Sequence, residues 1–210
     1  MKAFTPNNYK NGQRFNTFGL STLFTALMSS ALLFAPTVMA APVNYQIDSP
    51  GMHASVNFKI QHLGYSWLTG RFEKFDGQYT YDDQQLSNSK IAVTIDTASV
   101  STNHAERDVH LRSADFLNVK KHPKAQFVSD SISGTDKKMQ VAGKFTLNGV
   151  TKDIVIEAHK IGEGKDPWGG HRSGFSGTTA LKLVDYNISQ DLGPASAEVL
   201  LELHIEGVRK

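Results

Sequence analysis

The stretch Val199-Leu-Leu-Glu-Leu-His-Ile-Glu206 near the end of the chain alternates between apolar and polar side chains. Successive side chains in a β-strand point to opposite faces of the sheet, so Val199, Leu201, Leu203 and Ile205 would share one face. Glu202, His204 and Glu206 would occupy the other face, towards solvent. This period of two predicts a strand with one side against a core and the other in water.

The same alternation recurs in several other segments and predicts further strands there. These segments are Val56–His62, Ile91–Ile95, Met139–Leu147, Ile154–Ile156 and Phe175–Leu181. Asn148-Gly149 separates two of them and is a preferred pair for a two-residue type I′ hairpin. Asp76-Gly77 and Ser133–Asp136 predict other turns, and Glu163–Gly170 predicts a longer exposed loop. About seven to nine short strands of this kind predict an all-β fold, either an antiparallel β-barrel or a sandwich.

The first forty residues have the character of an export signal. Lys2, Lys10 and Arg14 give a positively charged start without an acidic residue, and an apolar run covers Gly19–Ala35. Val38-Met-Ala40 supplies suitable residues before a cleavage site. We therefore expect residues 1–40 to be a cleaved signal peptide and residues 41–210 to form one domain without a transmembrane span. The bacterial periplasm is the expected destination, with secretion beyond it as the second choice.

Charge and cysteine content exclude several classes of protein. The chain has 22 Lys and Arg against 20 Asp and Glu, and three of the bases but none of the acids lie in the expected signal. The remaining chain has 19 bases and 20 acids, with no basic stripe that would indicate nucleic acid binding. The absence of cysteine excludes disulfides, a lipoprotein anchor, a thiol nucleophile and cysteine-ligated metal.

A polar stretch, Thr102–Leu117, interrupts the strand pattern with charged residues and two histidines. Asn103 followed by Glu106 has the form of a helix capping box. Asp108 and Arg112 are spaced four residues apart, which would let them pair on one helix face. We expect a short helical insert around residues 103–117 that covers or rims part of the barrel.

Catalytic and metal-binding interpretations find little support in the residue spacing. The eight histidines include no zinc motif such as His-Glu-x-x-His, so no metal site is expected. Serine, histidine and acidic residues are present, but no Gly-x-Ser-x-Gly motif marks a nucleophile. An enzyme is not expected, although a periplasmic hydrolase of a small substrate stays as an alternative. That alternative predicts that alanine at His62 or Arg107 abolishes turnover without changing lipid content.

The residues predicted to face inward mix large and small side chains. The large ones include Phe58, Phe72, Phe127, Phe145 and Phe175, and the small ones include Ala125, Gly143 and Ala180. A closed sheet of about eight strands is wide enough to be filled by side chains or to hold one small ligand. The pattern alone therefore leaves two alternatives open, a ligand cavity and a dry core. A dry core would suit a stress-related interaction module.

Several motifs occur in order along the chain, and Arg107-Asp-x-His-Leu-Arg-Ser-x-Asp-Phe-Leu117 is the most specific. The others are Tyr45-x-Ile-Asp48, His53-x-x-Val-x-Phe58-x-Ile-x-His62, Gly70-x-Phe72-x-x-Phe75-x-Gly77, Ser99-Val-x-Thr102, Pro123-x-x-x-Phe127, Gly143-x-Phe-Thr-Leu147, Gly149-Val-Thr-x-Asp153 and Glu198-Val199. Together they resemble the YceI-like family, the polyisoprenoid-binding, lipocalin-like proteins of bacterial periplasms. The chain departs from the family where Leu183 replaces a common Arg and Asn187 a common Gly. Asparagine tolerates left-handed backbone angles, so the turn there is expected to persist.

The resemblance implies a non-enzymatic, extended antiparallel β-barrel of about eight strands, lipocalin-like, that buries a long isoprenoid or similar amphiphile. The expected ligand is an isoprenoid quinone or a polyprenyl phosphate, with no further cofactor. Exposed edge strands could support a homodimer.

At the mouth of such a barrel, Arg107 could donate hydrogen bonds to a phosphate or quinone oxygen. Asp108 would instead orient Arg112 or a backbone group. The alternative for both residues is a structural clamp that holds the insert on the barrel. The residues expected to contact ligand are Phe58, Ile60, His62, Phe72, Ile91, Val93, Arg107, Asp108, Leu111, Phe116, Phe127, Phe145 and Phe175.

Overall fold

A computed structural model describes residues 41–51, 53–190 and 192–210, so the expected signal peptide lies outside it. The strands are β1 (Val43–Ile47), β2 (Ser55–His62), β3 (Ser66–Phe72), β4 (Phe75–Tyr81), β5 (Lys90–Asp96), β6 (Val100–Ser101), β7 (Lys124–Thr135), β8 (Lys138–Leu147), β9 (Val150–Lys165), β10 (His171–Lys182) and β11 (Glu198–Arg209). The described residues also contain one α-helix, α1 (Ala105–Arg112), and four short 3₁₀ helices. These are η1 (Leu86–Asn88), η2 (Thr97–Ser99), η3 (Leu183–Tyr186) and η4 (Pro194–Ser196). Within the described ranges, no helix has the length and hydropathy needed to cross a membrane.

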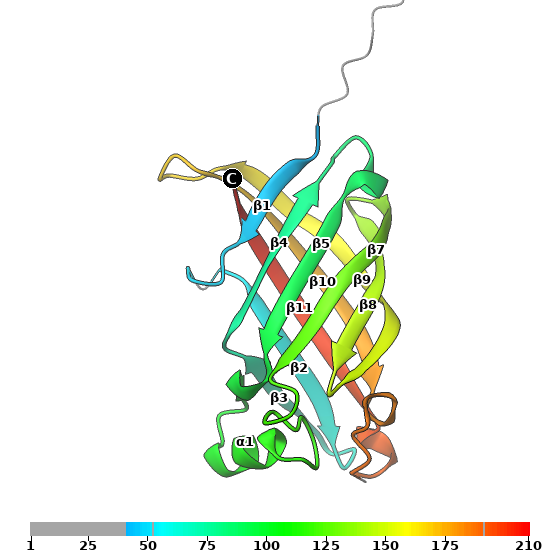
Figure 1. The fold of residues 1–210 in the computed structure, drawn as a ribbon. Coiled ribbons are helices and arrows are strands. Elements are labelled where there is room, and N and C mark those ends of the chain that lie inside the picture. Colours follow the sequence, from blue (N-terminus) through cyan, green and yellow to red (C-terminus); the bar gives the residue numbers. More distant parts are fainter. Residues whose placement is uncertain (1–40, 52, 191) are drawn as a thin grey trace, which may run out of the picture. The chain divides into compact units, whose positions relative to one another are not determined.

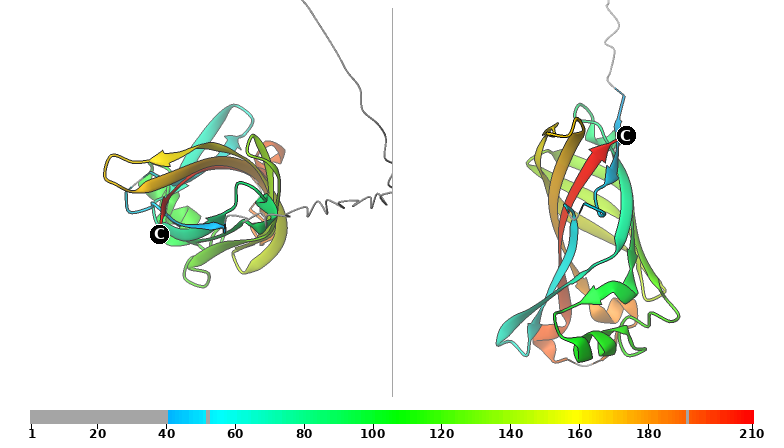
Figure 2. Two further views of the ribbon diagram at one scale, coloured as in Figure 1. Left: turned by 90° about the horizontal axis from the view of Figure 1, so that it is seen from above. Right: turned by 90° about the vertical axis from the view of Figure 1, so that its left-hand side faces the viewer.

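Eight strands form a closed antiparallel barrel in the order β1-β4-β5-β7-β8-β9-β10-β11, because β11 pairs back to β1. Seen from above, the strands form a closed ring (Figure 2, left). The ring closes where the first strand meets the last, since Tyr45 of β1 pairs with Arg209 of β11. The prediction of an all-β fold with a barrel of about eight strands is confirmed, and the sandwich alternative is wrong.

β2 and β3 extend the barrel wall beyond the ends of β1 and β4. β11 pairs with β1 near its end and with β2 over its first half, where Leu201 lies opposite Phe58. β3 pairs with β2 along its length and with β6 at Arg71 and Phe72. This extension reaches the lower end of the barrel in Figure 1, where α1 and the β2–β3 hairpin lie. The long wall explains how the interior gains depth along the barrel axis.

The alternating residues of the predicted strands face the interior as expected. Val56 and Phe58 on β2 belong to the buried core, and so does Leu201 on β11. Lys59 on the outer face of β2 forms an ion pair with Glu202 on the outer face of β11, with 2.5 Å between Nζ and Oε1. The period of two in the sequence therefore corresponds to an apolar interior and a polar exterior.

The predicted turns are confirmed in one case and corrected in three. Asn148 and Gly149 have φ angles of 48° and 77° and join β8 to β9, as a type I′ hairpin requires. Asp76-Gly77 is not a turn but lies inside β4; a Cβ on Gly77 would stand 2.5 Å from the carbonyl oxygen of Ala92, so this glycine permits close approach of two strands. β7 continues to Thr135, which places its turn later than predicted. β9 continues to Lys165, which shortens the predicted 163–170 loop.

The helical insert is confirmed, but its details differ from the prediction. α1 begins after His104, whose Nδ1 accepts a hydrogen bond from the Arg107 backbone N–H at 3.3 Å. Asn103 is therefore not the N-cap; it has a φ of 59°, a left-handed conformation that turns the chain into the helix. Arg112 donates to the carbonyl oxygens of Ala98 and Val100 rather than pairing with Asp108.

Candidate functional site

Two adjoining cavities occupy the barrel interior. The lower cavity has a volume of about 560 Å³ and lies at the end that carries α1, the β2–β3 hairpin and η3. The upper cavity has a volume of about 120 Å³ and lies between β4, β5, β8 and β10. Val56, Ile95, Phe145 and Leu201 border both cavities, and we call these four residues the waist. The lower cavity has the size typical of small-molecule binding sites.

Tyr79, Tyr81 and Phe175 line the upper cavity, and Tyr45 packs behind Tyr79; we call these four residues the aromatic floor. Tyr45 stacks on Tyr79 with 4.9 Å between ring centroids, and Tyr81 meets Phe175 edge-on at 5.2 Å. Burial, together with a hydrogen bond to Glu163, raises the pKa of Tyr45 to about 12. The Tyr45 phenol behind the cavity wall therefore stays neutral at physiological pH.

Several polar side chains line the lower cavity at its open end, which we call the mouth. Gln61 and His62 reach it from the β2–β3 hairpin, and Arg107 and His110 reach it from α1. The His110 ring meets the edge of Phe116 with 4.9 Å between ring centroids. The site therefore combines an apolar interior with a few hydrogen-bonding groups at one end.

Arg107 lines the lower cavity and also holds the insert in place. Its Nε donates to the hydroxyl of Thr102 at 2.8 Å, and its Nη2 donates to the carbonyl oxygen of the same residue at 2.8 Å. Within the described part of the chain, its Nη1 group has no hydrogen-bond partner. Because a guanidinium has five N–H donors, Arg107 can keep both bonds to Thr102 and still donate to a ligand.

Asp108 has a different role, because it is buried and lines neither cavity. Its Oδ1 accepts hydrogen bonds from the backbone N–H of Thr102 at 2.9 Å and from its hydroxyl at 2.5 Å. Asp108 therefore orients a backbone group, as predicted, and its expected contact with a ligand stays a prediction. We call Thr102, Arg107 and Asp108 the insert clamp.

The structure places the other predicted contact residues around the two cavities. Those around the lower cavity are Phe58, Ile60, His62, Phe72, Arg107, Leu111 and Phe116. Those around the upper cavity are Ile91, Val93, Phe127 and Phe175, and Phe145 borders both. Contact of these residues with a ligand stays a prediction.

Sequence reasoning missed one wall of the lower cavity. Leu183 of η3 and Ile188 after it line this cavity, together with Leu181 at the end of β10. η3 has no strand periodicity, so no pattern in the sequence places Leu183 and Ile188 inward. Asn187 follows η3 with a φ of 56°, which confirms the expected left-handed turn. Leu183 therefore places an apolar side chain in the cavity wall.

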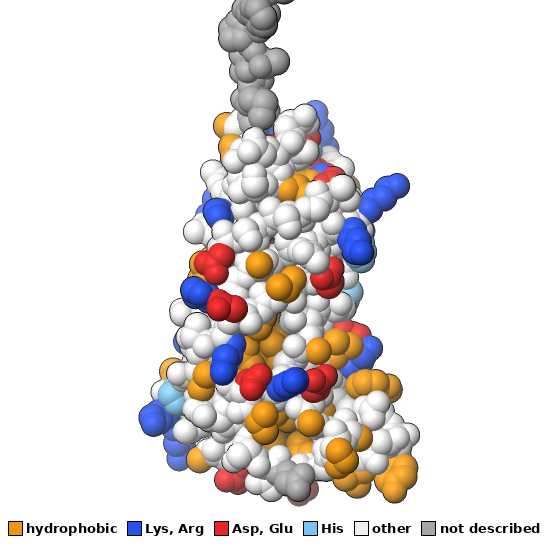
Figure 3. Space-filling view, turned by 90° about the vertical axis from the view of Figure 1, so that its right-hand side faces the viewer, with side chains coloured by type: hydrophobic (Ala, Val, Ile, Leu, Met, Phe, Trp, Pro, Cys, Tyr) orange, Lys and Arg blue, Asp and Glu red, His pale blue; other side chains and the backbone are white. Residues whose placement is uncertain are grey.

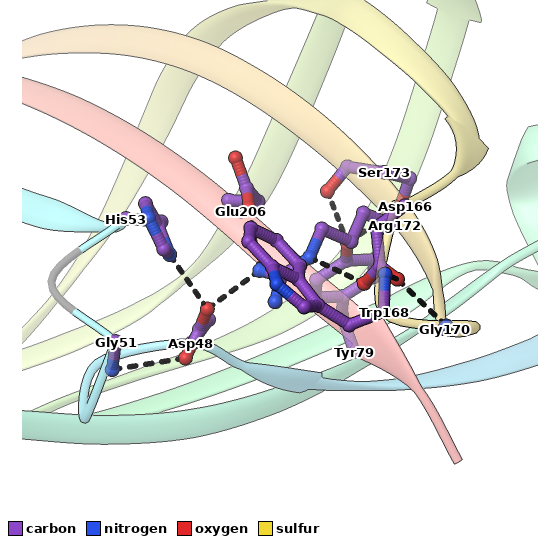
Figure 4. Close-up of polar contacts among 10 residues, drawn as sticks. All are labelled: Asp48, Gly51, His53, Tyr79, Asp166, Trp168, Gly170, Arg172, Ser173 and Glu206. Carbon is purple, nitrogen blue, oxygen red and sulfur yellow. Dashed lines mark hydrogen bonds and ion pairs between the residues drawn. The ribbon is translucent and has the colours of Figure 1, made fainter.

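The upper end of the barrel carries an ion-pair cluster around Arg172 (Figure 4). Arg172 Nη1 lies 2.6 Å from Asp48 Oδ2 and 2.7 Å from Glu206 Oε1, and its Nε lies 2.8 Å from Asp166 Oδ2. The Trp168 ring lies over the guanidinium, with 5.5 Å from its centroid to the Arg172 Cζ. These contacts tie the segment after β1 and the β9–β10 loop to β11.

Asp48, His53 and Glu206 are the one group in the described ranges with side-chain atoms placed for a metal ion, all within 4.8 Å of one another. Arg172 donates to both carboxylates of this group, and His53 Nδ1 lies 2.9 Å from Asp48. The guanidinium thus already supplies the positive charge that these carboxylates need. We interpret the group as part of the ion-pair cluster.

We predict that acid destabilises the protein through Asp48 and Glu163. The hydrogen bond from Arg172 is the main cause that lowers the pKa of Asp48 to about 2. Burial opposes the charged form of Glu163, but hydrogen bonds led by that from Lys160 outweigh it and lower its pKa to about 2. Because the unfolded pKa values are about 4, this stabilisation is complete above pH 4 and lost as pH falls towards 2.

Thermal unfolding followed by circular dichroism between pH 5 and pH 2 measures this effect. We expect Glu163→Gln to reduce the fall in Tm across this range. Asp153→Asn removes an exposed carboxylate of the same strand, β9, and should leave the fall unchanged. An undiminished fall in Glu163→Gln would show that Glu163 does not contribute.

A UPF0312 protein of Ectopseudomonas mendocina is 56% identical over 192 residues, which cover 91% of this chain and 100% of that protein. The crystal structure of the YceI protein of Campylobacter jejuni has a TM-score of 0.65 and 31% identity, covering 72% of this chain and 90% of that chain. A polyisoprenoid binding domain from Saccharophagus degradans shares the fold, with a TM-score of 0.59 and 16% identity over 80% of this chain and 99% of that chain. The YceI-like domain model matches residues 45–207, and the chain therefore belongs to the YceI-like family.

Proposed function

We propose that this protein binds a long-chain isoprenoid lipid inside the barrel and serves as a periplasmic carrier or reservoir for it. The observation that carries this proposal is the lower cavity of about 560 Å³, which is lined mainly by apolar side chains and meets polar groups at its mouth. A dry core would leave no such volume, because side chains in protein interiors normally pack as densely as organic crystals.

The apolar tail would occupy the lower cavity and extend past the waist towards the upper cavity. Each methylene group that leaves water contributes about 0.8 kcal/mol, so a long prenyl chain can bind through buried area alone. The waist residues are all hydrophobic, which keeps the path between the two cavities apolar. The aromatic floor would then set the depth that the tail can reach.

The polar headgroup would stay at the mouth near Arg107 and His62. The Nη1 group of Arg107 can donate to a phosphate or a quinone carbonyl while the insert clamp stays intact. His62 is exposed at the end of β2 and borders the same opening. This arrangement supports an isoprenoid quinone or a polyprenyl phosphate as the ligand class.

Further support comes from the comparison with a fold neighbour and from the amino terminus. The Saccharophagus degradans neighbour is described as a polyisoprenoid binding domain. The signal character of residues 1–40 supports the periplasm as the compartment. We also propose that the protein acts without catalysis and binds no cofactor besides the lipid. A homodimer through the edge of β3, which pairs with β6 at two positions, is part of the same proposal.

Native mass spectrometry of the protein purified from its own periplasm tests this proposal directly. We expect one prenyl lipid per chain, and organic extraction followed by phosphorus analysis would separate a polyprenyl phosphate from a quinone. Absence of lipid, together with a crystal structure in which the lower cavity is closed, would refute the proposal.

A further inference from the structure

Five exposed hydrophobic side chains lie around the mouth of the lower cavity, and we call them the apolar rim. They are Leu63, Tyr65 and Trp67 of the β2–β3 hairpin, Val109 of α1 and Val184 of η3. Tyr65 is 86% exposed and Val184 67% exposed. Large hydrophobic side chains in water cost free energy, so a group of them around one opening calls for a physical explanation.

The apolar rim is continuous with the lining of the lower cavity. Leu63 belongs to both, because it borders the cavity and is itself 58% exposed. On α1, Leu111 lines the cavity while Val109 points to solvent. On η3, Leu183 lines the cavity while Val184 points to solvent. Three segments far apart in the sequence therefore place apolar side chains both inside the opening and outside it.

The β2–β3 hairpin presents its part of the rim through one hydrogen bond to its backbone and one contact between side chains. Ser196 of η4 donates its hydroxyl hydrogen to the Gln61 carbonyl oxygen at 2.5 Å. Lys59 places its Nζ 5.4 Å from the centroid of the Trp67 ring. Leu63 has a φ of 53°, a left-handed conformation that is uncommon for a residue with a side chain. Leu63 therefore carries two costs at this position, the exposure of its apolar side chain to water and its left-handed backbone conformation.

Other exposed hydrophobic side chains of the described residues are spread over separate parts of the barrel. Val128 and Val155 lie on the outer faces of β7 and β9, and Ile161 and Trp168 lie at or near the β9–β10 loop. In Figure 3, hydrophobic side chains gather towards the lower end, the end at which α1 and the β2–β3 hairpin lie in Figure 1. The rim therefore differs from the other exposed hydrophobic side chains, because its members lie together around the mouth.

We propose that the apolar rim docks the mouth of the barrel onto the surface of a lipid bilayer. This inference rests on the proposed function, because a prenyl lipid is stored in bilayers and would pass between membrane and cavity without crossing water. Tryptophan and tyrosine are the residues that favour the membrane–water interface, and both occur in the rim. Arg107 at the same opening would face the lipid headgroups and add a favourable charge interaction with anionic lipids.

The small size of the rim implies reversible docking. Five side chains bury far less apolar surface than a transmembrane helix, and even a single myristoyl chain gives only weak, reversible membrane binding. Reversible attachment is what a carrier requires, because the protein must leave the membrane with its ligand.

Flotation with vesicles of phosphatidylethanolamine and phosphatidylglycerol tests the docking surface. The double variant Tyr65→Ser with Trp67→Ser removes two rim side chains that line neither cavity. We expect this variant to bind the vesicles about tenfold less than the wild type or weaker still. Trp168→Ser is the matched control, because it removes a tryptophan that is 76% exposed in the loop before β10, away from the mouth. This control should bind vesicles like the wild type.

The lipid content of each purified variant, measured by native mass spectrometry, separates this proposal from the proposed function. Wild-type protein that carries lipid but does not bind vesicles would overturn the docking proposal and leave lipid binding intact. Vesicle binding without any lipid content would support docking and, together with a closed lower cavity, would refute the proposed function. Equal loss of vesicle binding in the rim variant and in Trp168→Ser would also overturn the docking proposal. A protein partner that is lost from the rim variant, with no vesicle binding by the wild type, would overturn it as well.

Discussion

Replacing Val199 by tryptophan should remove most of the bound lipid from the protein. Val199 lines the lower cavity from β11, two residues before the waist residue Leu201. The indole ring would project into the volume that we assign to the prenyl tail. Displacing only two methylene groups costs about 1.6 kcal/mol, which corresponds to a loss of affinity of more than about tenfold.

Leu200→Trp is the matched control for this variant. Leu200 is the next residue of the same strand and lines neither cavity, since its side chain points to the other face of the sheet. We expect this variant to keep its lipid, as measured by native mass spectrometry after purification from the periplasm. Circular dichroism would confirm that both variants are folded. A folded Val199→Trp protein with unchanged lipid content would show that the lower cavity is not the binding site.

Local alternation predicts much of this fold because each strand has one apolar face. The alternation from Val199 to Ile205 is enough to predict a strand. Asn148-Gly149 is enough to predict the β8–β9 hairpin, because both residues readily adopt the positive φ angles of its turn. Such features depend on residues that are close in sequence. Asp76-Gly77 misled the prediction because the same dipeptide serves either a turn or a close approach of strands. Only the position of Ala92 on the neighbouring strand decides between these roles.

Strand periodicity predicts the part of the candidate site that lies on strands, but it does not predict the wall formed by η3. Phe58 and Phe145 follow from strand periodicity, and both border the lower cavity. Leu183 does not, because the direction of its side chain depends on where η3 packs against β9 and β10. The same holds for the apolar rim, whose members become neighbours only when the hairpin, α1 and η3 meet at one end of the barrel.

Arg107 and Asp108 are neighbours in the sequence but have different surroundings in the structure. Both residues bind Thr102, but Arg107 also borders the cavity and keeps a donor available for a ligand. Asp108 is only 7% exposed, and its Oδ1 accepts both hydrogen bonds from Thr102 within the insert clamp. A ligand effect is therefore expected at Arg107, and a stability effect at Asp108.

Replacing Asp108 by alanine should destabilise the protein by about 2–3 kcal/mol. The substitution leaves the backbone N–H and the hydroxyl of the buried Thr102 without their acceptor, and hydrogen bonds to charged groups contribute about 1.5–3 kcal/mol. Arg107 and Arg112 of α1 keep their hydrogen bonds to Thr102, Ala98 and Val100, so we expect a loss of stability without release of the helix. Urea unfolding followed by circular dichroism measures the loss as a lower midpoint.

Two further variants decide whether the carboxylate acts through these bonds. Asp108→Asn keeps an oxygen acceptor at the same position and should lose only about half as much stability, because an uncharged acceptor forms a weaker bond. Asp115→Ala removes a carboxylate that is 60% exposed near the end of the insert and should leave the midpoint nearly unchanged. Equal losses in Asp108→Ala and Asp115→Ala would contradict the clamp, because they would trace the effect to the net charge of the insert. A distinct loss in Asp108→Ala, with partial rescue by asparagine, ties the stability of the mouth to the hydrogen bonds of Thr102.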